Sequence, residues 1–188
     1  MIKKDELSRT LAFSDAVVAV ALTLLVLPLT DIFSKEKHID LLNTMTLSTI
    51  LSSFMSFLVS FFVIYSFWVA HRHIFSSVRE ISKKTDTLNA WWLFTLVLIP
   101  AATAMNWANI HNQGMYVYSL VILINSLILQ RLKASINGSY KLYNSSMLIL
   151  MFLSFMILLF FPNIGYKVYF SLFFSGVMQR LFPNIFYD

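Results

Sequence analysis

The sequence is poor in the residues that define several common protein classes. It contains no cysteine, only four glycines and only four prolines in 188 residues. The absence of cysteine excludes disulfides and thiolate metal sites, and it leaves the redox compartment undefined. The low glycine and proline content is not typical of fibrous or disordered chains. Charged residues make up 12% of the chain, whereas a soluble domain has about a quarter.

What the chain has instead is apolar residues, which form 58% of it. Uncharged runs of about 20 residues are long enough to cross a bilayer as helices. The sequence therefore predicts an all-α, polytopic membrane protein with a single domain over residues 1–188. We expect six transmembrane helices, at about 9–29, 41–70, 88–107, 115–132, 144–161 and 167–186.

The net charge of +5 does not indicate nucleic-acid binding in such a chain. Basic residues of membrane proteins mainly record orientation, because cytoplasmic loops retain lysine and arginine. With the N-terminus inside, only Lys35, Lys37 and Lys167 of the 14 basic residues fall on the opposite side. The bias predicts an even number of spans and two cytoplasmic termini.

A polar cluster interrupts the start of the first predicted helix. Arg9, Ser14 and Asp15 lie in its first turns. A carboxylate at mid-bilayer costs about 2.5–3.5 kcal/mol on insertion scales, so Asp15 needs a partner or a wet cavity. Arg9 and Asp15 are six residues apart and do not stack on one helix face. We therefore expect each to find partners on another helix or subunit.

Candidate partners for Asp15 lie at the end of the second predicted helix, at the same expected depth. They are Trp68, His71 and His73. An indole or imidazole N–H can donate to a carboxylate. Such contacts are compatible with a static brace between helices or with a proton-sensing element, because histidine titrates near neutral pH. Two histidines two positions apart on a helix face different ways, so a metal site is not expected.

Beyond the cluster, the first helix carries one stripe at helical spacing. It consists of Ala16, Val20, Thr23 and Leu27. Such a stripe can pack against lipid or protein, or it can line a pore, and periodicity does not distinguish these roles.

The polar cluster and the stripe together resemble a family signature. R-x-x-x-F-S-D followed by A-x-x-A-x-x-x-T-L-x-x-L-P is similar to the signature of the transmembrane protein 175 family of potassium channels. Two further stretches resemble the same family, Trp68-x-x-His71-x-x-x-Phe75 and Leu88-Asn89 through Pro100 to Thr103. The residues that carry the first match are Arg9, Phe13, Ser14, Asp15, Ala16, Thr23, Leu24, Leu27 and Pro28.

The resemblance implies a potassium-permeable homotetramer in the cell (inner) membrane of a prokaryote, contacting membrane lipid and needing no cofactor. Its pore would be lined by the first helix, without a re-entrant carbonyl filter. The apolar constriction would fall on Val20, Thr23 and Leu27, with Ala16 and Leu24 beside them. The family usually has Ile or Leu where this chain has Val20. The resemblance further implies a structural network that holds the helix in register, formed by Arg9, Phe13, Ser14, Asp15, Trp68 and His71.

Three other functions remain open on the residues alone. A proton-coupled transporter could use Asp15 and His71, although transporters often have broken helices at mid-membrane and paired repeats. An enzyme would need a convergent catalytic set, and Ser14 beside Asp15 has no oxyanion-hole glycine near it. A scaffold without transport is the third. We expect no enzymatic activity.

Overall fold

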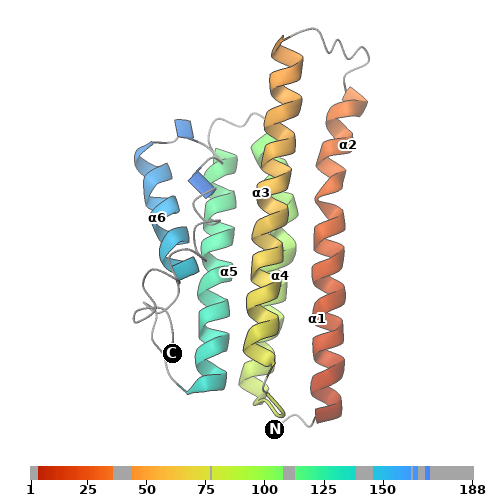
Figure 1. Cartoon of the computed structure of the whole chain (residues 1–188), viewed down its shortest axis with the longest axis vertical. Helices are drawn as coiled ribbons and strands as arrows, with labels where there is room; N and C mark the ends of the chain where they lie inside the picture. Colours follow the sequence, from red (N-terminus) through yellow and green to blue (C-terminus); the bar gives the residue numbers. More distant parts are fainter. Residues whose placement is uncertain are drawn as a thin grey trace.

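The computed structural model describes residues 4–35, 44–76, 78–107, 113–138, 146–161, 163–164 and 168–169 as a bundle of helices (Figure 1). The six helices are α1 (Lys4–Leu24), α2 (Val26–Lys35), α3 (Thr44–Phe75), α4 (Lys83–Trp107), α5 (Gln113–Asn137) and α6 (Ser146–Phe160). α1 and α2 lie at one edge of the bundle and α6 lies at the other. α4 packs against α1, α3 and α5.

Four stretches of these helices are long and apolar enough to cross a membrane, namely Asp5–Thr30, Ile50–Phe75, Lys83–Met105 and Gln113–Asn137. α6 is apolar but has 15 residues, fewer than the ~20 needed to span. The sixth predicted span, 167–186, lies outside the described residues except for 168–169. The described chain is thus an all-α membrane protein with four spanning stretches and a fifth, shorter apolar helix.

The first predicted span, 9–29, is not one continuous helix. α1 ends at Leu24 and α2 begins at Val26, so the helix breaks at Leu25. Pro28 lies four residues after Leu24. Proline has no N–H to donate to the carbonyl four residues earlier, and its ring clashes with that carbonyl. The break therefore falls where the backbone hydrogen bond from residue 28 to Leu24 would have been.

Local signals set the ends of α4 and α5. The Ser82 hydroxyl accepts a hydrogen bond of 3.1 Å from the Thr85 backbone N–H, which caps the start of α4. α5 ends at Gly138, whose φ of 69° is left-handed and whose N–H donates to the Ala134 carbonyl. Glycine adopts this conformation without strain.

The core lies between α3, α4 and α5. Its largest fully buried side chains include Phe67, Trp92, Leu96 and Ile122. Polar groups within this core pair with one another: Ser60 Oγ lies 3.1 Å from the Tyr118 hydroxyl and 2.9 Å from Thr103 Oγ1. The Asn125 amide donates to the Trp92 carbonyl and to Thr95 Oγ1. In lipid such pairs hold helices together, because an unpaired polar group has no water to bind.

Candidate functional site

α1 has two faces with opposite environments. One face is buried against the bundle and repeats at helical spacing through Leu7, Ser14, Val18, Ala21 and Leu25, each at most 3% exposed. The opposite face carries Ala16, Val20, Thr23 and Leu27, which we call the α1 stripe. All four side chains are exposed in the single chain, Val20 at 53% and Leu27 at 57%.

The α1 stripe is apolar except for its hydroxyls. Thr23 Oγ1 donates a hydrogen bond of 2.8 Å to the Val20 carbonyl, within its own helix. A hydroxyl that donates its one proton keeps its oxygen lone pairs available. Thr30 is exposed in the same way and donates to the Leu27 carbonyl at 2.7 Å. Thr30 was not singled out from the sequence, although it follows Thr23 by seven residues, which is close to two turns.

One predicted pore residue lies off this stripe. Leu24 is half-buried, and it is only one residue from the exposed Thr23, so about 100° of helix rotation separates their side chains. The structure therefore places Ala16, Val20, Thr23 and Leu27 together on one face and turns Leu24 to its side.

The buried face of α1 is fixed by two sets of polar contacts that we call the polar brace, made by Ser14, Asp15, Trp68, His71 and Asn89. The first set joins α1 to α3. Trp68 Nε1 donates to Asp15 Oδ1 at 2.8 Å. The Arg72 guanidinium lies 4.7 Å from the centroid of the Trp68 ring, in cation–π geometry.

The second set joins α1 to α4 and α3 through one asparagine. Asn89 Nδ2 donates to Ser14 Oγ at 3.0 Å, and Asn89 Oδ1 lies 2.7 Å from His71 Nε2. Because the amide nitrogen is used toward Ser14, its oxygen faces the imidazole, and Nε2 is assigned as the donor. Ser14 in turn donates to the Thr10 carbonyl at 2.9 Å. Ser14, His71 and Asn89 are each at most 2% exposed.

The imidazole of His71 is also held by aromatic rings. It stacks on Trp92 with ring centroids 4.2 Å apart and planes within 7°, and it contacts Phe75 at 4.8 Å. A ring clamped on its face and bonded at its edge has one allowed orientation. His71 therefore acts as a fixed strut between α3 and α4.

The sequence predicted four of the five residues of the polar brace but did not single out Asn89, which lies at its centre. Trp68 is the partner predicted for Asp15, whereas His71 binds Asn89 and not Asp15. His73 is exposed. Asn89 was quoted only as part of a resembling stretch, although an asparagine within an apolar helix is itself a signal for an interhelical hydrogen bond.

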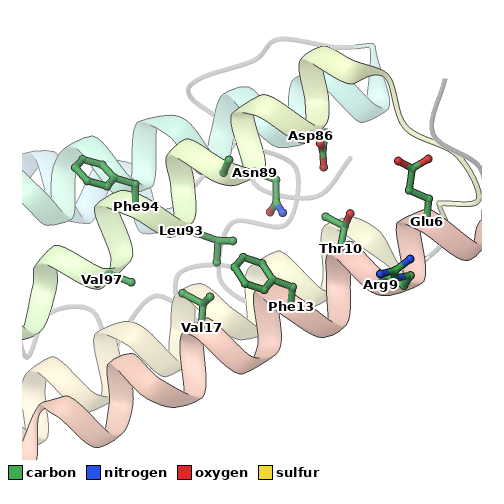
Figure 2. Close-up of a pocket in the computed structure, with 11 residues that line it drawn as sticks. Glu6, Arg9, Thr10, Phe13, Val17, Asp86, Asn89, Leu93, Phe94 and Val97 are labelled. Atoms are coloured by element: carbon green, nitrogen blue, oxygen red, sulfur yellow. The ribbon is translucent and has the colours of Figure 1, made fainter.

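The two remaining predicted network residues lie in a groove instead. Arg9 and Phe13 line a cavity of about 780 Å³ between α1 and α4, together with Glu6, Thr10, Val17, Asp86, Asn89, Ala90, Leu93, Phe94 and Val97. Figure 2 shows Glu6, Arg9 and Asp86 toward one end of it and Val17, Phe94 and Val97 toward the other. We call this cavity the α1–α4 groove.

No group of three or more metal-ligating side chains occurs among the residues that the structure describes. The polar groups near α1 are used in helix-to-helix contacts, and the exposed face offers apolar surface and hydroxyl oxygens. The arrangement provides a rigid helix presenting that face, and it offers no catalytic set.

Comparison with known proteins identifies relatives for these same elements. Residues 9–100 match the family described as the endosomal/lysosomal potassium channel TMEM175. A protein named a potassium channel from Chamaesiphon minutus is 36% identical over 107 residues, which are 55% of this chain and 50% of the relative. One from Streptomyces collinus is 32% identical over 137 residues, 68% of this chain and 63% of the relative. One from a Chryseobacterium strain is 33% identical over 92 residues, 49% of this chain and 44% of the relative.

The matched regions thus span about half the length of these curated relatives. The fold agrees more widely. The crystal structure of a lysosomal potassium-selective channel TMEM175 homolog from Chamaesiphon minutus superposes with a TM-score of 0.72 at 26% identity. That likeness covers 92% of this chain and 97% of the other. The chain is thus similar to the TMEM175 family of potassium channels in sequence over residues 9–100 and in fold over most of its length.

Proposed function

We propose that the chain is the subunit of a potassium-permeable cation channel whose pore is lined by the α1 stripe. The observation that carries the proposal is the pairing of an exposed apolar and hydroxyl face with a buried face anchored to both α3 and α4. Support also comes from the relatives, which are named potassium channels, and from the solved homolog, which is described as potassium-selective.

One copy of α1 cannot enclose a pore, so the proposal requires several copies around an axis. We assign four, the number that the family resemblance implies. Four copies of Val20 and Leu27 then form apolar rings that close the pore by contact or by dewetting. Four Thr23 oxygens, whose lone pairs remain available, coordinate a partly dehydrated cation between those rings.

The polar brace gives this arrangement its precision. Rotating α1 by one residue, about 100°, would replace Val20 by Ala21 or Ala19 in the ring. Ser14 and Asp15 bind two different helices, so such a rotation would break both sets of contacts. The basic-residue bias supports a cytoplasmic location for this end of the bundle.

Proton-coupled transport by Asp15 and His71 finds less support. The two side chains do not bind each other: Asp15 accepts from Trp68, and His71 is bound to Asn89 and stacked on Trp92. A proton relay needs groups that exchange partners, whereas these are held by separate neighbours.

The test is flux through purified protein in liposomes, with potassium and sodium compared and the oligomer mass determined in parallel. Val20→Asn introduces a hydrated ring and is expected to raise cation flux roughly tenfold or more, because dewetting is lost. Thr23→Ala removes the oxygens and is expected to lower the potassium-to-sodium ratio.

The matched control is Val117→Asn, the same change at an exposed valine of α5, which is 37% exposed. It should leave flux at the wild-type level. Unchanged flux and selectivity in both Val20→Asn and Thr23→Ala would show that α1 does not line the pore.

A further inference from the structure

The α1–α4 groove shares only Asn89 with the polar brace, and it is open on the side of the bundle. Its walls are apolar at one end, where Phe13, Leu93, Phe94 and Val97 lie, and charged at the other. Phe13 is 64% exposed and Phe94 is 55% exposed in the single chain. In a membrane such a groove is covered either by lipid or by another protein, and the features that follow favour a second copy of the chain.

A complementary ridge runs along α3, on the other side of α1. Phe61, Tyr65, Trp68 and Arg72 follow at spacings of four, three and four, so they share one face of α3. Trp68 fixes where this face lies, because its indole reaches Asp15 on α1. Tyr65 is 46% exposed, Arg72 is exposed and Phe61 is half-buried. We call Phe61, Tyr65 and Arg72 the α3 ridge.

The groove and the ridge flank the α1 stripe on opposite sides. Ser14 binds α4 and Asp15 binds α3, and consecutive side chains on a helix point about 100° apart. When the stripe faces the axis of a ring, the groove therefore faces one neighbour and the ridge faces the other. In a closed ring each interface joins two different surfaces, so the ridge of one copy meets the groove of the next.

The α3 ridge and the α1–α4 groove lie at matching heights along the bundle. Copies related by rotation about the membrane normal lie at equal depth, and Trp68 and Asn89 are level because they bind consecutive residues of α1. Arg72 lies four residues from Trp68 and Asp86 lies three residues from Asn89, toward the same end of the bundle. At 1.5 Å per residue these offsets are about 6 Å and about 4.5 Å.

The apolar side chains of the ridge and the groove also lie at similar heights, on the side of Trp68 and Asn89 that points away from the charged end. Tyr65 lies about 4.5 Å above Trp68, and Phe94 lies about 7.5 Å above Asn89. Phe61 and Val97 lie about 10.5 Å and about 12 Å above the same levels. On both the ridge and the groove, aromatic or apolar side chains lie toward the membrane interior. The charged side chains of both lie toward the end where α1 begins.

The charges at that end are complementary. Glu6 and Arg9 are three residues apart on α1, close enough to offset each other. Asp86 is then the acid that remains on the α4 wall, and Lys83, one turn earlier, is not among the residues that line the groove. On the ridge the corresponding position is the exposed Arg72.

We propose that the α1–α4 groove is the acceptor half of the interface between subunits, filled by Phe61 and Tyr65 of a second copy, with the second copy's Arg72 paired to Asp86. This inference rests on the proposed function, because it takes the stripe as facing the axis of a ring. It adds which surfaces of the chain meet.

The absence of cysteine provides a clean background for testing this pairing in the membrane. Tyr65→Cys and Phe94→Cys in one chain, treated with a short bis-maleimide, should give a ladder of covalent oligomers that ends at the closed ring. Each single variant alone should stay uncross-linked, and a mixture of the two should give dimers. The control pair Tyr65→Cys with Val117→Cys should not react. Dimers from either single variant, or reaction of the control pair alone, would overturn the proposal.

A charge exchange tests the same interface without relying on packing. Asp86→Lys and Arg72→Glu should each increase subunit dissociation in detergent roughly five- to tenfold, and the double variant should recover most of that loss. A lipid in the groove would instead remain attached in native mass spectrometry, and the double variant would restore nothing. Those two results together would refute the proposal that a second copy of the chain fills the groove.

The outcomes separate this proposal from the channel itself. A ring that conducts but gives no Tyr65–Phe94 cross-link refutes the interface and leaves the channel. A cross-linked ring whose cation flux does not respond to Val20→Asn or Thr23→Ala refutes the pore assignment and supports the interface.

Discussion

The two faces of α1 differ in what holds them in place. On the buried face Ser14 accepts a hydrogen bond from Asn89 of α4, and Asp15, at the exposed edge of that face, accepts one from Trp68 of α3. The exposed face makes no such contacts; the hydroxyls of Thr23 and Thr30 bond only to their own helix. A substitution on the first face should therefore act on folding, and one on the second should act on function. The difference teaches that a residue can matter for permeation while contributing little to the stability of its own subunit.

The largest expected effect is on the brace. Asn89→Leu leaves Ser14 and His71 without their shared partner in a dry interface, and it should lower the free energy of unfolding by about 2–4 kcal/mol. Denaturant titration in mixed micelles measures this. Asn137→Leu, at the exposed end of α5, is the control and should change stability little. Equal effects of the two variants would refute a central role for Asn89.

Two valines two residues apart give the sharpest comparison. Val18 is 3% exposed and Val20 is 53% exposed. Val18→Asn buries an unpaired amide and should destabilise the protein by about 1–3 kcal/mol. Val20→Asn should change stability by less than about 0.5 kcal/mol while it changes flux. Stability and flux measured on the same preparations test this, and destabilisation by Val20→Asn alone would reverse the assignment of the two faces.

A smaller effect is expected for the link between α1 and α3. Trp68→Phe keeps the ring but removes the N–H that donates to Asp15, which should cost about 1 kcal/mol. The matched control is Trp91→Phe, at a tryptophan that is 56% exposed on α4. Thermal unfolding of both variants gives the comparison. If both midpoints shift alike, the Trp68–Asp15 bond contributes nothing specific.

The smallest energetic effect should come from replacing Pro28, which follows the break at Leu25. Pro28→Ala restores a backbone donor and should make the helix continuous across Leu25. The distance between spin labels on Ala12→Cys and Thr30→Cys, both at exposed positions, should then equal the roughly 27 Å expected of 18 residues in one helix. An unchanged distance would mean that contacts with α3, not the proline, set the break.

Local chemistry explains why part of the site was predictable from the sequence. Asp15 had to find a donor, and of the three candidates expected at its depth the structure shows Trp68 donating to it. The stripe followed from helical spacing. Of the other two candidates, His71 binds Asn89 on α4 at 2.7 Å and His73 is exposed, because residues at one depth do not have to face each other. The first helix, expected over 9–29, is divided at Leu25, close to Pro28.

The sequence by itself determined that this is an all-α membrane protein, because uncharged runs of spanning length have no other stable state in lipid. It also carried the family resemblance and the two faces of the first helix, since both depend on residues close together in the chain. Only the tertiary structure decided which face is buried, that Asn89 joins three helices, and that α1 and α4 leave a groove between them. These features depend on how helices distant in the chain are rotated against one another, and hydrophobic periodicity in lipid does not specify that rotation.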